Sequence, residues 1–336
     1  MVLEYSTERQ LLIKSKATTM CSYTQKQGLM HDTLEKRREK EKQIRNNFLY
    51  GSPISTVDYS EKMDTMKTEF AERVPLVTEV DGKVSAEDAK GLRPLHLAAR
   101  ESNLSTTRQL LRDNADSNIQ NQDGWTPLHY ACKYSSKNMV QELLKFGGDL
   151  NRDMNIGNKD GWTPLHVACQ FSTPGIVSTL LEAGAKTNLQ NSEGWTPLHL
   201  ACEFSREEIV DLLLSYGADC NIENKNGWIP VHTASEYSTS NVMRQLILKG
   251  GDINARNRTG WTPLHLASVY STKEMVTTIL ELKGDINAWN VDGETPSQLA
   301  KRFKNMNVYE VLIENEEVLC ENEIGCFSNL KSMLQI

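Results

Sequence analysis

Six of the seven histidines in this chain of 336 residues recur at one position of a repeated pattern, whose fullest form is Gly-Trp-Thr-Pro-Leu-His. They are His96, His129, His166, His199, His232 and His265. By residue type, an array of imidazoles is a candidate metal site. One histidine per repeat, however, places neighbours roughly 10 Å apart, about one helix diameter, which is beyond the reach of a shared ion. We therefore expect a structural role for the histidines, and no metal or other cofactor.

No Ser-His-Asp arrangement, phosphate-binding loop or isolated carboxylate pair stands outside the repeats, so we predict no catalytic residues and no enzyme. The residues that suggest chemistry of another kind are aromatic. A tryptophan follows the turn glycine in five repeats: Trp125, Trp162, Trp195, Trp228 and Trp261. A tyrosine or phenylalanine precedes a serine further along the same repeats: Tyr134, Phe171, Phe204, Tyr237 and Tyr270.

Aromatic side chains, Trp and Tyr above all, dominate the energetics of protein interfaces. These two rows are therefore candidate partner-binding residues. Two alternatives stay open at this stage. Each tryptophan stacks on a neighbouring aromatic ring and only stiffens the repeats, or recent duplication of the repeat has copied one sequence several times.

The elements that position these residues are two short helices per repeat. Gly124 permits the positive φ of a tight turn, Thr126 is suited to cap a first helix, and Pro127 fits its first position. An apolar group at 139–144 has the spacing of a second helix, which Gly147 closes. The prolines of the pattern stand at 94, 127, 164, 197, 230, 263 and 296, with successive spacings of 33, 37, 33, 33, 33 and 33.

A period of 33 residues carrying Thr-Pro-Leu-His resembles the ankyrin-repeat family. The resemblance implies an all-α solenoid of helix-turn-helix units joined by β-hairpin fingers. It implies that the histidine bonds the backbone of a neighbouring turn, and that both aromatic rows face the concave groove. It also implies candidate sites of asparagine hydroxylation at Asn254 and Asn287, with shaping of the hairpin as the alternative role. The family usually has Gly-His between its helices, so the end of the first helix must differ here.

The pattern predicts three regions. A polar leader spans 1–85, with a basic helix at about 32–47 that is a solvated helix, a nuclear-import patch or a partner contact; a further hypothesis is that it occupies the aromatic groove and inhibits binding there. Seven repeats span 90–316, and a capping segment spans 317–336. The expected repeats are 90–122, 123–159, 160–192, 193–225, 226–258, 259–291 and 292–316. The second has four extra residues, which we place at about Arg152 to Asn155 as a tolerated insertion or a longer finger.

A net charge of −7 makes nucleic acid a poor general partner, and no apolar run is long enough for a membrane helix. The seven cysteines include no C-x-x-C pair, and the N-terminus has no signal-peptide layout. We expect a cytoplasmic protein, with the nucleus as an alternative and the oligomeric state open. The predicted function is a scaffold or adaptor that binds an extended protein or peptide segment in the aromatic groove. The alternative is an ankyrin-type inhibitor that masks a transcription factor or signalling partner.

Overall fold

The computed structural model describes residues 91–146 and 154–317. The chain divides into two compact units, Met1–Asp81 and Gly82–Ile336, and every described residue belongs to the second. The expected leader helix at 32–47, the helix-closing Gly147 and nearly all of the 317–336 segment lie outside the described residues.

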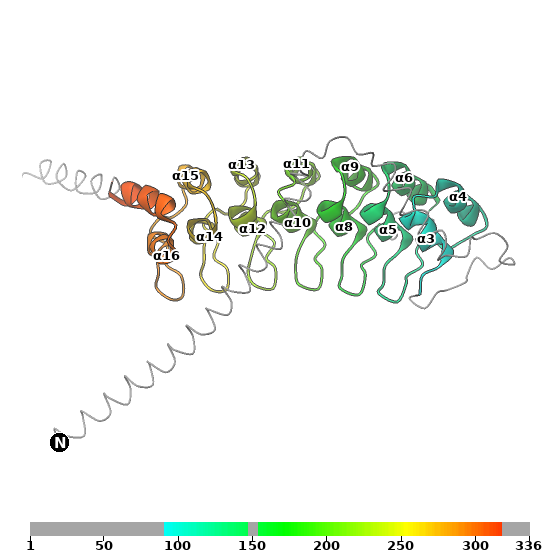
Figure 1. The fold of residues 1–336 in the computed structure, drawn as a ribbon, viewed down its shortest axis with the longest axis horizontal. Coiled ribbons are helices and arrows are strands. Elements are labelled where there is room, and N and C mark those ends of the chain that lie inside the picture. Colours follow the sequence, from blue (N-terminus) through cyan, green and yellow to red (C-terminus); the bar gives the residue numbers. More distant parts are fainter. Residues whose placement is uncertain (1–90, 147–153, 318–336) are drawn as a thin grey trace, which may run out of the picture. The chain divides into compact units, whose positions relative to one another are not determined.

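Two rows of helices form the described part of the chain (Figure 1). The inner helices, next to the connecting loops, are α3 (Pro94–Arg100), α5 (Pro127–Tyr134), α8 (Pro164–Phe171), α10 (Pro197–Glu203), α12 (Pro230–Tyr237), α14 (Pro263–Tyr270) and α16 (Pro296–Arg302). The outer helices are α4 (Leu104–Arg112), α6 (Lys137–Phe146), α9 (Pro174–Glu182), α11 (Glu207–Ser215), α13 (Ser240–Leu248) and α15 (Lys273–Glu281). Residues 306–317 are also helical. This all-α arrangement confirms the predicted solenoid.

Each inner helix begins at the proline of the pattern, and in α5, α8, α10, α14 and α16 the side chain of the preceding threonine caps it. In α5 the hydroxyl of Thr126 accepts the backbone N–H of His129, and the Nδ1 atom of His129 accepts the backbone N–H of Thr126 at 3.1 Å. Pro127 loses nothing at the first position, where no backbone partner exists for its nitrogen. The cap is therefore reciprocal, as the sequence predicted for Thr126.

Neighbouring repeats share one continuous core. Leu128 and Ala131 of α5 and Met139, Val140 and Leu143 of α6 are all at most 5% exposed. Equivalent side chains fill the same positions in later repeats, and they join a single apolar cluster that runs from Leu95 to Leu312. A helix pair of this kind cannot bury its apolar face alone, so the stacking of repeats is what makes each pair stable.

The connecting loops form fingers built from turns, and no residue of 91–146 or 154–317 is in a β-strand. Successive fingers bond through the backbone: Lys159 N donates to Asp123 O at 3.0 Å, and the same bond recurs down the stack. The turn glycine has a positive φ, +79° at Gly124, and a Cβ there would lie 2.8 Å from the backbone nitrogen of Lys159. Glycine is thus required both for the turn and for the close approach of the next finger.

Candidate functional site

The five tryptophans lie where each finger meets its inner helix. Their indole rings are half-buried, and each faces the motif histidine of its own repeat. The distances between ring centroids are 5.5 Å for Trp125–His129, 6.0 Å for Trp162–His166, 5.4 Å for Trp195–His199, 6.0 Å for Trp228–His232 and 6.1 Å for Trp261–His265. Each indole therefore packs against a histidine on one side and keeps part of its surface exposed to solvent.

The second aromatic row is exposed unequally. Tyr134, Phe171 and Phe204 are 54, 46 and 37% exposed, whereas Tyr237 and Tyr270 are half-buried. These residues stand at the ends of successive inner helices. Three consecutive repeats therefore present large apolar side chains to solvent from one row of helices.

The two aromatic rows meet around Lys133. Its ammonium group lies 5.5 Å from the ring centre of Trp125, 5.0 Å from that of Tyr134 and 4.8 Å from that of Phe171. Tyr130 adds a fourth ring, stacked on Tyr134 with centroids 6.4 Å apart. These distances are within the range of cation–π attraction. The sequence prediction missed Lys133 and Tyr130, although Lys133 is the residue directly before the aromatic position.

The inner helices end in two ways. Neither uses the Gly-His pair that the ankyrin-repeat family usually has between its helices. Ser135 and Ser172 are extended, with φ of −118° and −103°. Ser102 and Ser205 instead take the left-handed conformation, with φ of 58° and 51°. The extended type precedes a serine or threonine that begins the second helix, and the left-handed type precedes Asn or Arg. The turn that joins the inner helix to the outer one therefore differs between repeats.

The histidines bond the backbone of the following repeat, which confirms their expected structural role. His129 Nε2 donates to Trp162 O at 2.8 Å, and His199 Nε2 donates to Trp228 O at 3.0 Å. Burial lowers the pKa to about 4 at His129, His166, His199 and His232. The rings are therefore neutral at pH 7. Within 91–146 and 154–317, no three His, Cys, Asp or Glu side chains are grouped so as to hold a metal ion.

The hairpin asparagines form a ladder between repeats. Asn254 Oδ1 accepts the backbone N–H of Asp285 at 2.7 Å, and its Nδ2 donates to Lys283 O at 3.2 Å. Asn221 and Asn188 make the same bonds one and two repeats earlier, respectively. Asn287 is exposed at the end of the ladder, with no side-chain hydrogen bond to the described residues. The amide of Asn254 thus has a structural role, and hydroxylation at either position stays a prediction.

The insertion in the second repeat lies earlier than predicted. Asn155 Oδ1 accepts the backbone N–H of Lys186 at 2.9 Å, so Asn155 is the ladder asparagine of this repeat. Met154 is fully buried, and Ile253, which takes the same position three repeats of 33 residues later, is buried too, at 8% exposure. The placement of Met154 and Asn155 in the insertion was wrong, because both belong to the regular repeat. The extra residues precede position 154.

The repeated cysteines of the inner helices are buried groups of the core. Cys132, Cys169 and Cys202 are at most 1% exposed and are free thiols. Burial raises the pKa of each of them, so the reactive thiolate is disfavoured. They act as small apolar side chains.

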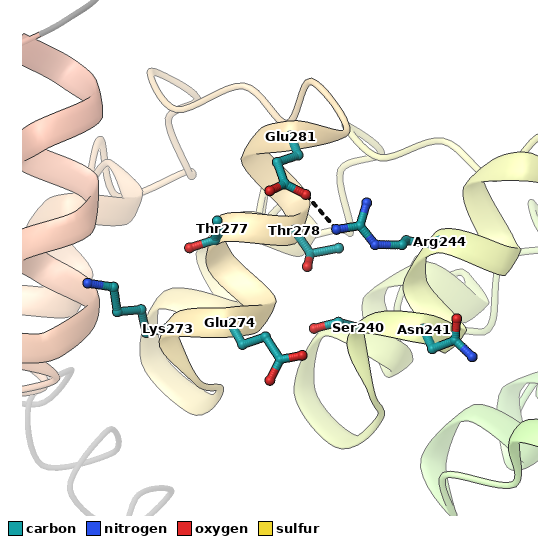
Figure 2. A pocket seen from close by; sticks show the side chains of 8 residues that line it. All are labelled: Ser240, Asn241, Arg244, Lys273, Glu274, Thr277, Thr278 and Glu281. Atoms are coloured by element: carbon teal, nitrogen blue, oxygen red, sulfur yellow. Dashed lines mark hydrogen bonds and ion pairs between the residues drawn. The ribbon is translucent and has the colours of Figure 1, made fainter.

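A surface groove between α13 and α15 is polar and offers no aromatic surface (Figure 2). It is lined by Ser240, Asn241, Arg244, Lys273, Glu274, Thr277, Thr278 and Glu281. The guanidinium of Arg244 reaches across to Glu281 at 2.5 Å. The groove therefore contains a contact between neighbouring outer helices, and it lies on the row opposite the fingers.

No helix of the described residues is long and apolar enough to cross a membrane. No curated protein matches the sequence. Among solved structures, the ankyrin repeat domain of Bcl-3, described as a unique member of the IkappaB protein family, matches with a TM-score of 0.57 and 28% sequence identity. The match covers 66% of this chain and 99% of that domain.

The family model for ankyrin repeats matches residues 75–154, 150–224, 213–290 and 231–322. The ankyrin fold is typically a non-enzymatic interaction module, and these similarities support a protein-interaction scaffold. On its repeats, its helix pairs and its histidine bonds, the chain belongs to the ankyrin-repeat family.

Proposed function

We propose that this protein is a non-enzymatic scaffold or adaptor that binds an extended segment of a partner protein along its aromatic rows. The observation that carries the proposal is the exposure of Tyr134, Phe171 and Phe204 in three consecutive repeats, at 54, 46 and 37%. A contiguous exposed apolar surface marks an interaction site more often than scattered exposed residues do. Aromatic anchors also supply most of the energy at protein interfaces.

The spacing of the repeats fits an extended ligand. Packed helices lie roughly 8–10 Å apart, and an extended chain advances about 3.3 Å per residue. About every third residue of a bound segment therefore meets the next aromatic pair. Five repeats accommodate a segment of about fifteen residues.

The test uses fifteen-residue peptides selected by phage display against the full chain, with Kd measured by fluorescence anisotropy. The variant Tyr134→Ala/Phe171→Ala/Phe204→Ala should weaken binding about a hundredfold, because each lost anchor costs about 1 kcal/mol. The matched control is Phe146→Ala/Tyr216→Ala, which removes side chains of 42 and 46% exposure from the outer helices. Equal affinity in the row variant and the control would reject the proposal.

A second arm asks whether the tryptophans bind or only stack. Trp195→Ala/Trp228→Ala should weaken peptide binding by about 2 kcal/mol per residue if the indoles are anchors. Because each of these indoles also packs against a histidine ring, the double substitution should lower the melting temperature as well. Intact affinity with a large fall in stability would leave the tryptophans a packing role alone.

The second candidate is an inhibitor that masks a transcription factor or signalling partner. The likeness to the Bcl-3 domain, placed in the IkappaB family, favours it as the alternative. Once a partner is known, measuring the partner's own activity in the complex distinguishes the two functions. A masking inhibitor abolishes that activity, and a scaffold leaves it intact. The buried free thiols fit a reducing compartment, and we propose the cytoplasm, with the nucleus as alternative.

A further inference from the structure

The last described finger, residues 285–294, carries two large apolar side chains that face solvent. Trp289 is 59% exposed and Val291 is 66% exposed. Earlier fingers have no large apolar residue at either position. The Trp289 position holds Gln120, Gly157, Gln190, Glu223 and Arg256, and the Val291 position holds Gln122, Lys159, Ser192, Lys225 and Arg258. The end repeat of a solenoid needs a polar outer face, so these two side chains indicate an edge that another segment covers.

Side chains at the Trp289 position extend toward the following finger. In three repeats they donate a hydrogen bond to a backbone carbonyl one finger on: Gln120 Nε2 to Gly157 O at 3.2 Å, Gln190 Nε2 to Glu223 O at 2.8 Å, and Arg256 Nη1 to Trp289 O at 2.8 Å. Among the described residues, no finger follows that of Trp289. The position therefore places the exposed indole on the outer edge of the stack.

Two amide side chains of the same finger also lack partners. The amide of Asn254 bonds the next repeat at Lys283 and Asp285, whereas Asn287 takes its place in the last finger and makes no side-chain hydrogen bond to the described residues. Asn290 is 6% exposed, and its Nδ2 atom has no hydrogen-bond partner within the described part of the chain. A buried donor has lost its bonds to water and favours a partner. The polar groups therefore indicate a covering segment, as the apolar ones do.

The helix at 306–317 brings the next segment of the chain to this edge. In the register of the repeat, residue 306 takes the place of Lys273 at the start of α15, and residue 317 takes that of Gly284, directly before Asp285 begins the last finger. Residues 318–336, which we call the tail, thus start where an earlier repeat enters its finger. At about 3.3 Å per residue, the first four residues of the tail can span about 13 Å, more than the roughly 10 Å between packed helices. The apolar residues of the tail are Val318, Leu319, Ile324, Phe327, Leu330, Met333, Leu334 and Ile336.

We propose that the tail packs along the outer edge of the last finger, where it covers Trp289 and Val291 and supplies partners to the amides of Asn287 and Asn290. Because the helix at 306–317 tethers the tail beside this edge, the effective concentration of the tail there is high and few contacts are needed to hold it. In this place the tail keeps a second chain from stacking on the open end. The edge belongs to a finger and not to the aromatic rows, so this inference and the proposed function are tested separately.

The first test traps the contact with the cysteines that the tail already contains, Cys320 and Cys326. In the full chain, Val291→Cys places a thiol on the proposed edge. Asn307→Cys, at an exposed site on the helix of the same repeat, is the control. After mild oxidation with diamide, peptide mass spectrometry should find a bond from position 291 to Cys320 or Cys326 within one chain, formed about tenfold faster than from position 307. Equal rates at the two positions, or a bond from position 291 chiefly to Cys21 or to a second copy of the chain, would overturn the proposal.

Two further substitutions show whether the indole holds the tail. In the Val291→Cys chain, Trp289→Ala should slow formation of the bond several-fold, because this ring is the largest exposed apolar group of the last finger. Leu248→Ala removes a side chain of 83% exposure from α13 and should leave the rate unchanged. If Trp289→Ala has no effect, or if both substitutions slow the reaction equally, the tail is not held at this edge.

An equilibrium measurement needs no introduced thiol. In the full chain labelled with 5-fluorotryptophan, Trp289→Phe assigns the ¹⁹F resonance of Trp289, and the shift of that resonance between H₂O and D₂O reports its exposure. A covered Trp289 should shift no more than the five half-buried tryptophans do. Ile324→Asp/Phe327→Asp should increase the shift, whereas Asn322→Asp/Ser328→Asp adds the same charge to the tail and should not. A larger shift for Trp289 than for the other five in the unmodified chain would show that the edge is bare and would refute the inference.

Discussion

The buried histidines make the protein's stability depend on pH between about pH 4 and pH 6.5. At His129, His166, His199 and His232, burial lowers the pKa from 6.5 to about 4. The folded pKa lies below the unfolded one. The stabilisation is therefore complete above pH 6.5, and it is lost as the pH falls through the folded pKa near 4.

The size of the effect follows from the two pKa values. Between pH 6 and pH 5, an unfolded histidine carries most of a proton and a folded one carries almost none. The free energy of unfolding should fall by about 1.2 kcal/mol per histidine over that unit of pH, or about 5 kcal/mol for the set. Ordinary carboxylates titrate mostly below this window, because their unperturbed pKa values are about 4.

The last repeat shows which substitution can test this prediction. In the last repeat Gln298 takes the histidine position, and its Oε1 accepts the backbone N–H of Thr295 at 3.0 Å, as a histidine Nδ1 does elsewhere. His199→Gln should therefore keep the helix cap and lose the bond to Trp228 O. We expect its pH slope to be shallower than that of the wild type by about 1 kcal/mol per pH unit.

The assay is urea unfolding followed by circular dichroism at pH 5.0, 5.5, 6.0 and 7.0, on the wild type and the variant. His265→Gln is the control, since burial lowers the pKa of His265 too, but the backbone bond to Glu294 and the charge of Asp285 oppose that lowering. It should change the slope less than His199→Gln does. A slope identical in wild type and His199→Gln would refute the idea that these rings are held neutral.

Two further predictions concern left-handed backbone positions. Gly194 and Gly217 have nearly equal φ, +81° and +79°, but a Cβ at Gly194 would lie 2.8 Å from Asn224 Cα, whereas nothing lies within 4 Å at Gly217. Gly217→Ala should cost about 1–2 kcal/mol and Gly194→Ala about 2–5 in chemical denaturation, and equal losses would contradict the tight finger contact. Lys283 has a φ of 70° at the position of Gly217 in its repeat, so Lys283→Gly should raise stability by about 1 kcal/mol. A loss of stability in that variant would count against backbone strain at Lys283.

The sequence by itself determined the repeat and most of its internal geometry. The helix starts at Thr126 and Pro127 and the turn at Gly124 depend on neighbours within a few residues, so local chemistry specifies them. For His129, the period of 33 excluded a shared metal ion, the resemblance to the ankyrin-repeat family implied a bond to the backbone of a neighbouring turn, and the structure has that bond. The aromatic positions could be found from the sequence, but their exposures could not.

Only the tertiary structure decided what stands beside those positions. The convergence of Trp125, Tyr134 and Phe171 on Lys133 joins residues from two repeats, and no local pattern encodes such a distance. The position of the insertion, before residue 154, likewise follows from the bond that Asn155 makes to the next repeat. Sequence periodicity fixes each helix pair because its causes are local, whereas contacts between repeats depend on how the pairs stack, and that stacking creates the surface that we propose binds a partner.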